Sequence, residues 1–195
     1  MIVIDITECT KTKVKVRLDN REDFQLYKRE IVKYGIEVDK ELNNYDVILQ
    51  ETLIPRAKKR TMHLIGQMDR TKSDIIKKLK QNGYPDAAIE EALAYVESYN
   101  YVNDLRYAYM YVRTYRDSRS RNRIMQDMYR KGLDTDTINS AIESEYTTDE
   151  ADLIRRHIDK RGYNSSSASN RDRDKMYRYL LGKGFDLDTI RSVIE

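Results

Sequence analysis

The sequence predicts a mainly α-helical protein of three tandem three-helix repeats in an elongated, curved array, preceded by a small N-terminal β-hairpin and helix segment. Only 2 of its 195 residues are proline and 7 are glycine, so few positions interrupt a helix. Hydrophobic residues make up 39 % and charged residues 35 %, which suits thin helical layers better than one deep core. The third observation is an internal repeat.

Two strand patterns open the chain. Residues 2–7 are rich in β-branched side chains. Residues 12–18 alternate apolar side chains with basic ones, which is typical of a strand with one buried face. A short polar link joins the two segments, so we expect a β-hairpin.

Two helices are expected between this hairpin and the repeats. Residues 21–34 carry aromatic and aliphatic side chains at helical spacing, and Gly35 follows as a stop signal. A further helix is expected over 40–53, capped by Asp39 and ended by Pro55.

The repeat is marked by three glycines. Gly132 follows Gly83 by 49 residues, and Gly184 follows Gly132 by 52. Apolar side chains recur eight residues before each glycine, four before it and six after it: Ile75, Ile124, Met176; Leu79, Met128, Leu180; Ile89, Ile138, Ile190. These positions are expected to form the core of each repeat.

Each repeat is expected to contain a helix, a loop, a second helix, a glycine turn and a third helix. Glycine takes the left-handed conformation that ends the second helix, and Asp134 and Asp186 can cap the third. The second helices are expected to begin at Thr71, Ser120 and Asp172, and the first helices to span 56–69, 104–117 and about 149–161. Before Asp172 the chain is rich in serine, so residues 163–170 predict a mobile loop.

These patterns divide the chain into four parts. The N-terminal hairpin and helices occupy residues 1–55, and the three-helix repeats occupy 56–100, 101–148 and 149–195.

Basic residues gather in the second repeat. Between residues 106 and 131, only Asp117 and Asp127 oppose a basic set of Arg106, Arg113, Arg116, Arg119, Arg121, Arg123, Arg130 and Lys131. In the first repeat, Lys72 and Lys78 are further candidates. The net charge is only +3, so the position of the basic residues along the chain is more informative than their sum. This edge is either a solvated helix face or a surface that binds an anionic partner or nucleic acid.

A stripe of tyrosines shares this region. Tyr107, Tyr111 and Tyr115 recur four residues apart and so lie on one helical face. Such a stripe is typical of a face that packs on the core with its hydroxyl groups in water, although it could also contact a partner. Asn103 and Asp104 are expected to cap this helix.

Residues 101–142 resemble the RecX family of bacterial regulators of the RecA recombinase. The family's central repeat reads approximately aromatic, apolar, Asp/Asn, Asp, any residue, Arg, aromatic, Ala, followed by R-I-x-x-x-L-x-x-K-G-I. The matching residues here are Tyr101, Asn103, Asp104, Arg106, Tyr107 and Ala108, then Arg123, Ile124, Met128, Lys131, Gly132 and Leu133. The resemblance covers about residues 56–195, whereas the first 55 match only in layout.

One departure from the family pattern lies in the second repeat. The family usually carries glycine in the loop before the second helix of that repeat, where this chain has Ser118, Arg119 and Ser120. The loop shape is therefore expected to differ.

The resemblance implies a function in DNA repair, recombination and the SOS response. The family is expected to bind the RecA–single-stranded-DNA filament and to reduce its ATP turnover and strand exchange. Single-stranded DNA, and duplex DNA as a further candidate, are the nucleic-acid partners that it implies. The basic residues named above would carry this binding, without a cofactor.

The residues give little support to catalysis. His63 and His157 lie in different repeats, neither has metal-ligand spacing to the single cysteine Cys9, and the chain has no glycine-rich phosphate loop. No apolar run is long enough for a membrane span, so we expect a cytoplasmic monomer that binds rather than catalyses. Two alternatives to a filament regulator remain open: a nucleic-acid-binding helical protein without a filament partner, and a general helical scaffold.

Overall fold

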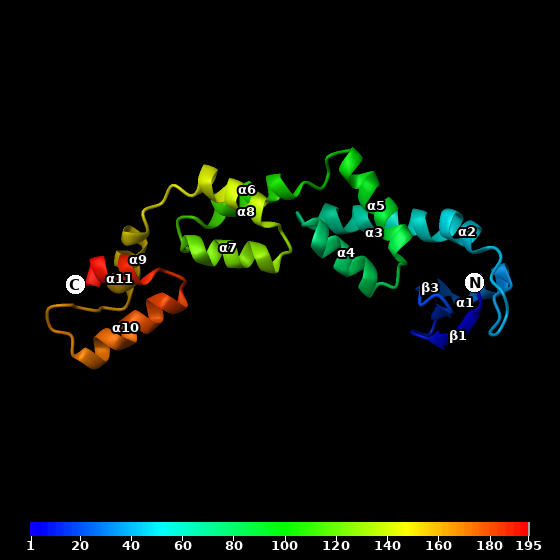
Figure 1. Ribbon diagram of the computed structural model, residues 1–195, viewed down its shortest axis with the longest axis horizontal. Helices are drawn as coiled ribbons and strands as arrows, with labels where there is room; N and C mark the ends of the chain where they lie inside the picture. Colours follow the sequence, from blue (N-terminus) through cyan, green and yellow to red (C-terminus); the bar gives the residue numbers. More distant parts are fainter. Residues whose placement is uncertain (195) are drawn as a thin grey trace. The chain divides into compact units, whose positions relative to one another are not determined.

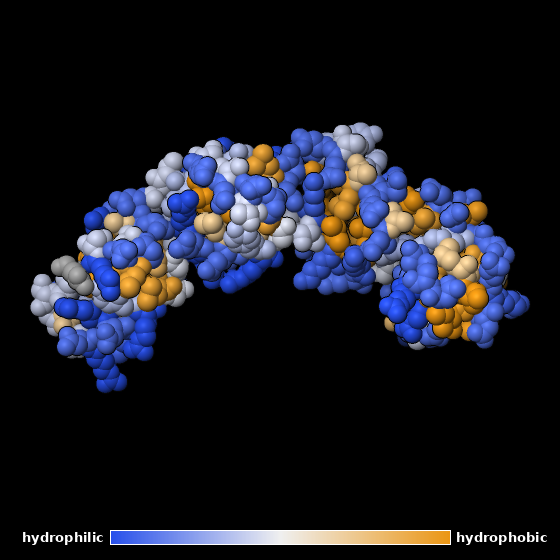
Figure 2. Space-filling model, in the orientation of Figure 1, coloured by the Kyte–Doolittle hydropathy of each residue, from blue (hydrophilic) through white to orange (hydrophobic). Residues whose placement is uncertain are grey.

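The computed structural model describes residues 1–194, and its contacts divide the chain into two compact units, Met1–Asn103 and Asp104–Glu195 (Figure 1). Each unit is described by itself. The fold is mainly helical with an N-terminal sheet, as the sequence predicts. No helix among the described residues is long and apolar enough to span a membrane. Hydrophilic residues cover most of the face in view (Figure 2).

The first unit opens with a three-stranded antiparallel sheet rather than a hairpin alone. Strands β1 (Val3–Glu8) and β2 (Lys13–Leu18) pair as the sequence predicts, and β3 (Asp23–Tyr27) continues the sheet in the order β1-β2-β3. The expected helix over 21–34 is therefore wrong in its first part. Phe24 and Leu26, both fully buried, alternate with half-buried residues, so the strand period prevails there.

Helix α1 (Lys28–Tyr34) forms only after this strand, and it ends at Gly35 as expected. Gly35 takes the left-handed conformation with φ 61°. The helix is short and buries no residue completely, so its apolar spacing is a weak signal. The predicted helix combined positions of β3 with positions of α1, and its start was therefore placed too early.

The helix expected over 40–53 begins later and does not end at Pro55. Helix α2 (Tyr45–Ile48) runs through a π-helical segment η1 (Leu49–Leu53) into α3 (Ile54–Gln67). Proline lacks an amide hydrogen and crowds the preceding turn, and a wider π turn just before Pro55 relieves this conflict.

Asp39 is not the cap of that helix. It has a left-handed backbone with φ 63°, and its amide donates to the Val3 carbonyl at 2.8 Å. The segment after α1 therefore runs along β1 before the helix begins.

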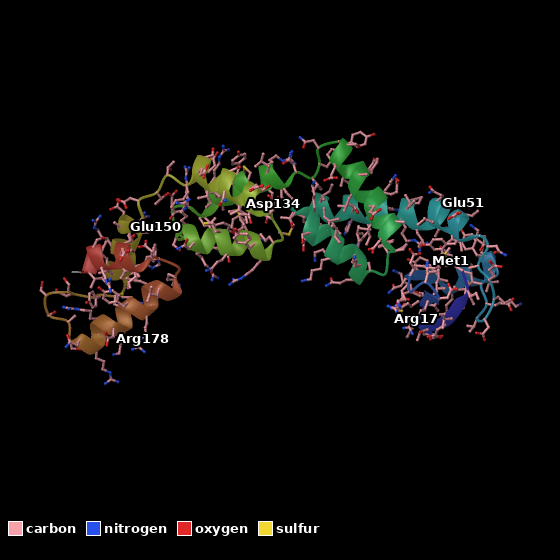
Figure 3. The ribbon with its side chains drawn as sticks, in the orientation of Figure 1. Met1, Arg17, Glu51, Asp134, Glu150 and Arg178 are labelled. Carbon is pink, nitrogen blue, oxygen red and sulfur yellow. The ribbon has the colours of Figure 1, made fainter. Side chains whose placement is uncertain are left out.

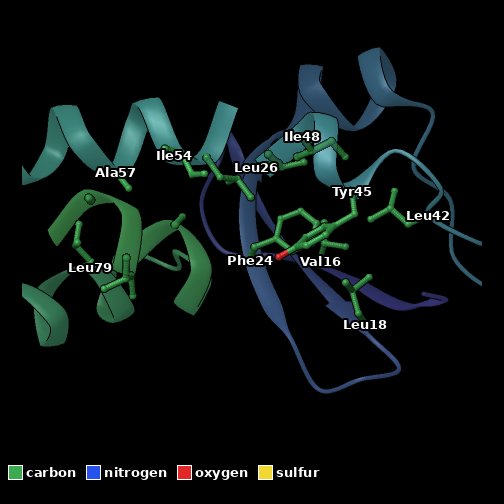
Figure 4. Packing of buried hydrophobic residues seen from close by; sticks show 14 of the residues in the cluster. Val16, Leu18, Phe24, Leu26, Leu42, Tyr45, Ile48, Ile54, Ala57 and Leu79 are labelled. Carbon is green, nitrogen blue, oxygen red and sulfur yellow. The ribbon is translucent and has the colours of Figure 1, made fainter. Parts of the chain in front are cut away.

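The first three-helix domain consists of α3, α4 (Lys72–Gln81) and α5 (Asp86–Ser98). Its core is continuous with that of the sheet, because Phe24 and Leu26 belong to the same buried cluster as Ala57 and Leu79 (Figure 4). The β3 edge also bonds to the glycine turn, where the Gln25 amide donates to the Gly83 carbonyl at 2.9 Å. The division expected at residue 55 falls inside α3 and inside this shared core.

The second unit holds two three-helix domains. The first consists of α6 (Asp104–Tyr115), α7 (Arg121–Arg130) and α8 (Thr135–Glu145). The next consists of α9 (Glu150–Lys160), α10 (Asn170–Gly182) and α11 (Leu187–Ile194). They have separate cores, one containing Ile124 and the other Leu180, so the aligned apolar positions are buried as predicted.

The helix caps follow the repeat with one correction. Thr71, Ser120, Asp134 and Asp186 each accept an amide three residues ahead, as expected of caps. In the third repeat, however, Ser169 caps α10 and Asp172 is its third helical residue. The helix therefore starts one turn earlier than predicted, because a serine at the end of the polar loop supplies the cap oxygen. The loop before it lies where expected, and its mobility stays a prediction.

Candidate nucleic-acid and partner interface

The tyrosine stripe of α6 packs on the core of the second domain. Tyr107, Tyr111 and Tyr115 are half-buried against this core, and their ring centroids lie 6.1 and 4.5 Å apart in sequence order. Burial raises the pKa of the Tyr111 hydroxyl. The stripe therefore forms part of the domain's own packing, which was one of its two expected roles.

Two of the predicted basic residues lie against these rings. The Arg119 guanidinium is 3.9 Å from the Tyr115 centroid, and the Lys131 ammonium is 5.4 Å from that of Tyr111. Arg119 Nη1 also donates to the Tyr111 hydroxyl at 3.0 Å. Cation–π contacts and this hydrogen bond hold both cations along the tyrosine face.

Asp127 gathers three of the predicted arginines. Its carboxylate lies 2.7 Å from Arg119 Nη1, 3.5 Å from Arg123 Nε and 3.4 Å from Arg130 Nη1. The Asp127 residue is only 9 % exposed, so its contacts are organised within the domain. One carboxylate among three guanidinium groups leaves a net positive charge.

Glu145 organises two more arginines. Arg113 donates to its two carboxylate oxygens at 2.7 and 2.6 Å, and Arg116 donates to its backbone carbonyl at 3.0 Å. Hydrogen bonding by Arg113 lowers the pKa of the Glu145 carboxyl. These arginines therefore tie α6 to the end of α8, and Arg116, which the sequence analysis included in the basic edge, is half-buried.

Arg106, Arg113, Arg121 and Arg130 are the exposed members of the set. The Arg121 amide donates to Glu150 at 2.6 Å, and the labelled Glu150 marks this place at the start of α9 (Figure 3). Lys72 and Lys78 lie on α4 of the first unit, where Lys72 pairs with Glu97. The structure thus gathers Arg119, Arg123 and Arg130 around Asp127, and Arg113 and Arg116 around Glu145. The two lysines belong to the other unit.

Glu145 is a partner of the basic set that was not predicted from the sequence. The predicted acidic neighbours of this set lie between positions 106 and 131, whereas Glu145 lies on the third helix of the same repeat. Its pairing with Arg113 depends on the packing of α8 against α6, which residue spacing within one helix does not indicate.

Among residues 1–194, histidine, cysteine and acidic side chains form no group of three or more that could hold a metal ion. His157 Nδ1 lies 3.1 Å from the Tyr179 hydroxyl, and its ring also contacts Phe185. Burial lowers the pKa of His157, with the cations near it adding to the effect.

Sequence profiles of one family match the three helical domains in order. They are those of the first, second and third three-helix domains of RecX, matched over residues 57–95, 103–142 and 148–194. The chain belongs to the RecX family. The resemblance seen in residues 101–142 is therefore confirmed, and RecX proteins are regulators rather than enzymes.

RecX relatives match nearly the whole chain. The regulatory protein RecX of Clostridium perfringens is 26 % identical over 98 % of this chain and 92 % of its own length. That of Caldanaerobacter subterraneus is 28 % identical over 100 % of this chain and 98 % of its own.

Solved structures show the same fold. The crystal structure of a regulatory protein RecX has a TM-score of 0.64 at 23 % identity, with 98 % of each chain covered. The RecX structure from Lactobacillus salivarius has a TM-score of 0.59 at 21 % identity and covers 72 % of this chain and 94 % of its own.

Proposed function

We propose that this RecX chain regulates the RecA recombinase by binding the RecA–single-stranded-DNA filament and reducing its ATPase and strand-exchange activity. The observation that carries the proposal is the match of all three helical domains, in order, to RecX. Repeats spaced at near-regular intervals suit a partner that is itself periodic. We expect the protein to act as a monomer in the bacterial cytoplasm.

The basic edge of the second domain supports an anionic partner. Arg119, Arg123 and Arg130 share one carboxylate, so positive charge remains at this surface. Guanidinium groups offer paired donors to phosphate and carboxylate oxygens, which suits both a DNA backbone and acidic protein surfaces.

Adding the protein to RecA assembled on single-stranded DNA tests the proposal. We expect the ATPase rate to fall at substoichiometric amounts. An unchanged rate at equimolar protein, with folding verified by circular dichroism, would contradict it. Salt-dependent binding to naked DNA without any effect on recombinase would instead favour a nucleic-acid-binding protein without a filament partner.

A pair of matched variants tests the surface. Arg121→Gln with Arg130→Gln removes two exposed charges and spares the arginines that hold Glu145. Arg173→Gln with Arg178→Gln makes the same charge change at exposed positions of α10, and Arg178 is labelled in Figure 3. We expect the first pair, and not the second, to weaken inhibition of the filament. Equal inhibition by both pairs and the wild type would place the surface elsewhere.

A further inference from the structure

An open pocket of about 450 Å³ lies between the two domains of the second unit. This volume is many times the roughly 30 Å³ that one water molecule occupies in the liquid. Arg119 and Arg123 line it from one domain, and His157 and Lys183 from the other. Four side chains able to carry positive charge therefore face one space.

One wall of this pocket is a close contact between the start of α7 and the turn after α10. Ser120 Oγ donates to the Lys183 carbonyl at 2.9 Å, and Gly184 follows with φ 89°. A Cβ atom at Gly184 would lie 2.7 Å from Ser120 Oγ and 3.2 Å from the Arg123 amide nitrogen. Only glycine fits this approach, and the approach holds Arg123 and Lys183 beside each other.

Positive charge in the pocket is only partly compensated. None of its lining residues within 1–194 is a carboxylate, and Asp127 meets Arg119 and Arg123 from outside the lining. The lowered pKa of His157 agrees with this: after burial, its causes are the cations Lys183, Lys160, Arg156 and Arg161. An anion would relieve the repulsion among these groups.

The pocket in the first unit, of about 400 Å³, provides a contrast. It too is lined by cations, but Lys15 lies 2.5 Å from Asp23 and Lys80 lies 2.9 Å from Asp86, and both carboxylates line the same pocket. Its charge is neutralised in place, so it offers no comparable attraction to an anion.

The N-terminus of α7 is not the attraction, although it borders the pocket. Ser120 Oγ accepts from the Arg123 amide at 3.2 Å, and Glu150 accepts from the Arg121 amide at 2.6 Å. The binding groups are therefore the side chains. Arg119 is held in place by Asp127 and by the Tyr115 ring, which reduces the entropy that it loses when a ligand binds.

We propose that this pocket binds a phosphate group through Arg123 and Lys183, with Arg119 and His157 beside them. The phosphate could come from the backbone of single-stranded DNA or from a free nucleotide. The expectation that DNA supplies the phosphate rests on the proposed function, whereas phosphate binding by the pocket does not.

The two histidines allow a direct test without recombinase. NMR would follow the imidazole signals of the full chain against pH, alone and with oligothymidylate, ATP or inorganic phosphate. A bound phosphate favours the charged imidazole, so the pKa of His157 should rise, and the signals of His63, on α3 of the first unit, serve as the internal control. Whether oligothymidylate or ATP acts at the lower concentration identifies the source. No shift, or equal shifts at both histidines, would overturn the proposal.

Matched variants give a second readout. Arg123→Gln with Lys183→Gln should weaken oligothymidylate binding about tenfold and flatten its salt dependence by about 0.7 for each phosphate that is no longer neutralised. Arg173→Gln with Arg178→Gln should change neither quantity. Equal losses of affinity in both pairs would mean diffuse attraction rather than a site. These binding measurements contain no recombinase. A negative filament assay would therefore contradict the proposed function but not phosphate binding by the pocket. Equal binding by the pocket variant and the wild type would contradict the pocket but not the proposed function.

Discussion

Within each of the two units, the parts are joined in a different way. In the first unit the sheet and the three-helix domain share one hydrophobic core, which joins Phe24 on β3 to Leu79 on α4. In the second unit each domain has its own core, and polar contacts such as that of Ser120 with Lys183 join them. A three-helix domain can thus be joined to its neighbour through a shared hydrophobic core or through polar contacts, which we call the polar joint. The two kinds of junction should respond differently to mutation.

The largest effects should come from the cores themselves. Leu79→Ala and Ile124→Ala each remove a fully buried side chain and should cost about 2–5 kcal/mol of unfolding free energy. Hydrogen exchange should separate the units: Leu79→Ala should loosen β3 as well as α4, whereas Ile124→Ala should leave α10 and α11 protected. Loss of protection across all of the second unit would show that its domains unfold together.

The glycine of the polar joint should come next. Gly184→Ala forces a left-handed alanine against Ser120 and the backbone of Arg123, so we expect a loss of about 2–4 kcal/mol. Gly162→Ala is the matched control, because Gly162 has φ 61° but nothing within 4 Å of the added Cβ. Denaturant unfolding should therefore show a clearly smaller loss for Gly162→Ala, and equal losses would mean that the joint yields easily.

A smaller effect is expected from the serine of the same joint. Ser120→Ala removes a helix cap and the bond to Lys183, and should cost about 1–2 kcal/mol. Ser169→Ala also removes a cap, but its hydrogen bonds stay within α10. If thermal unfolding shifts equally for both variants, the bond between the domains contributes nothing.

The smallest effect should be the pH dependence of the Arg113–Glu145 pair. Because Arg113 depresses the folded-state pKa of Glu145, the pair stabilises the fold above the unfolded-state value of about 4.3 and loses this contribution as pH falls through the depressed pKa. The difference in melting temperature between wild type and Arg113→Ala should thus shrink below about pH 4. A constant difference down to pH 2 would exclude this origin.

Much of the helical fold could be predicted because the repeat is local and periodic. The core positions around Gly83, Gly132 and Gly184, and caps such as Ser120 and Asp134, each depend on residues within a few turns. The short elements of the N-terminal region could not be assigned in the same way. Over the few residues around Phe24, the spacing of apolar side chains fits a strand and a helix equally well.

The candidate site was predictable only in composition. The sequence alone determined that arginines would gather in the second domain and that glycines would reverse the chain, because both follow from residue identity and spacing. Tertiary structure decided which arginines Asp127 and Glu145 would hold, and that Lys183 would meet Arg123 around one pocket. Arg113 and Arg116 lie 32 and 29 residues from Glu145, and Lys183 lies 63 residues from the Ser120 that it contacts. Only packing brings such distant residues together.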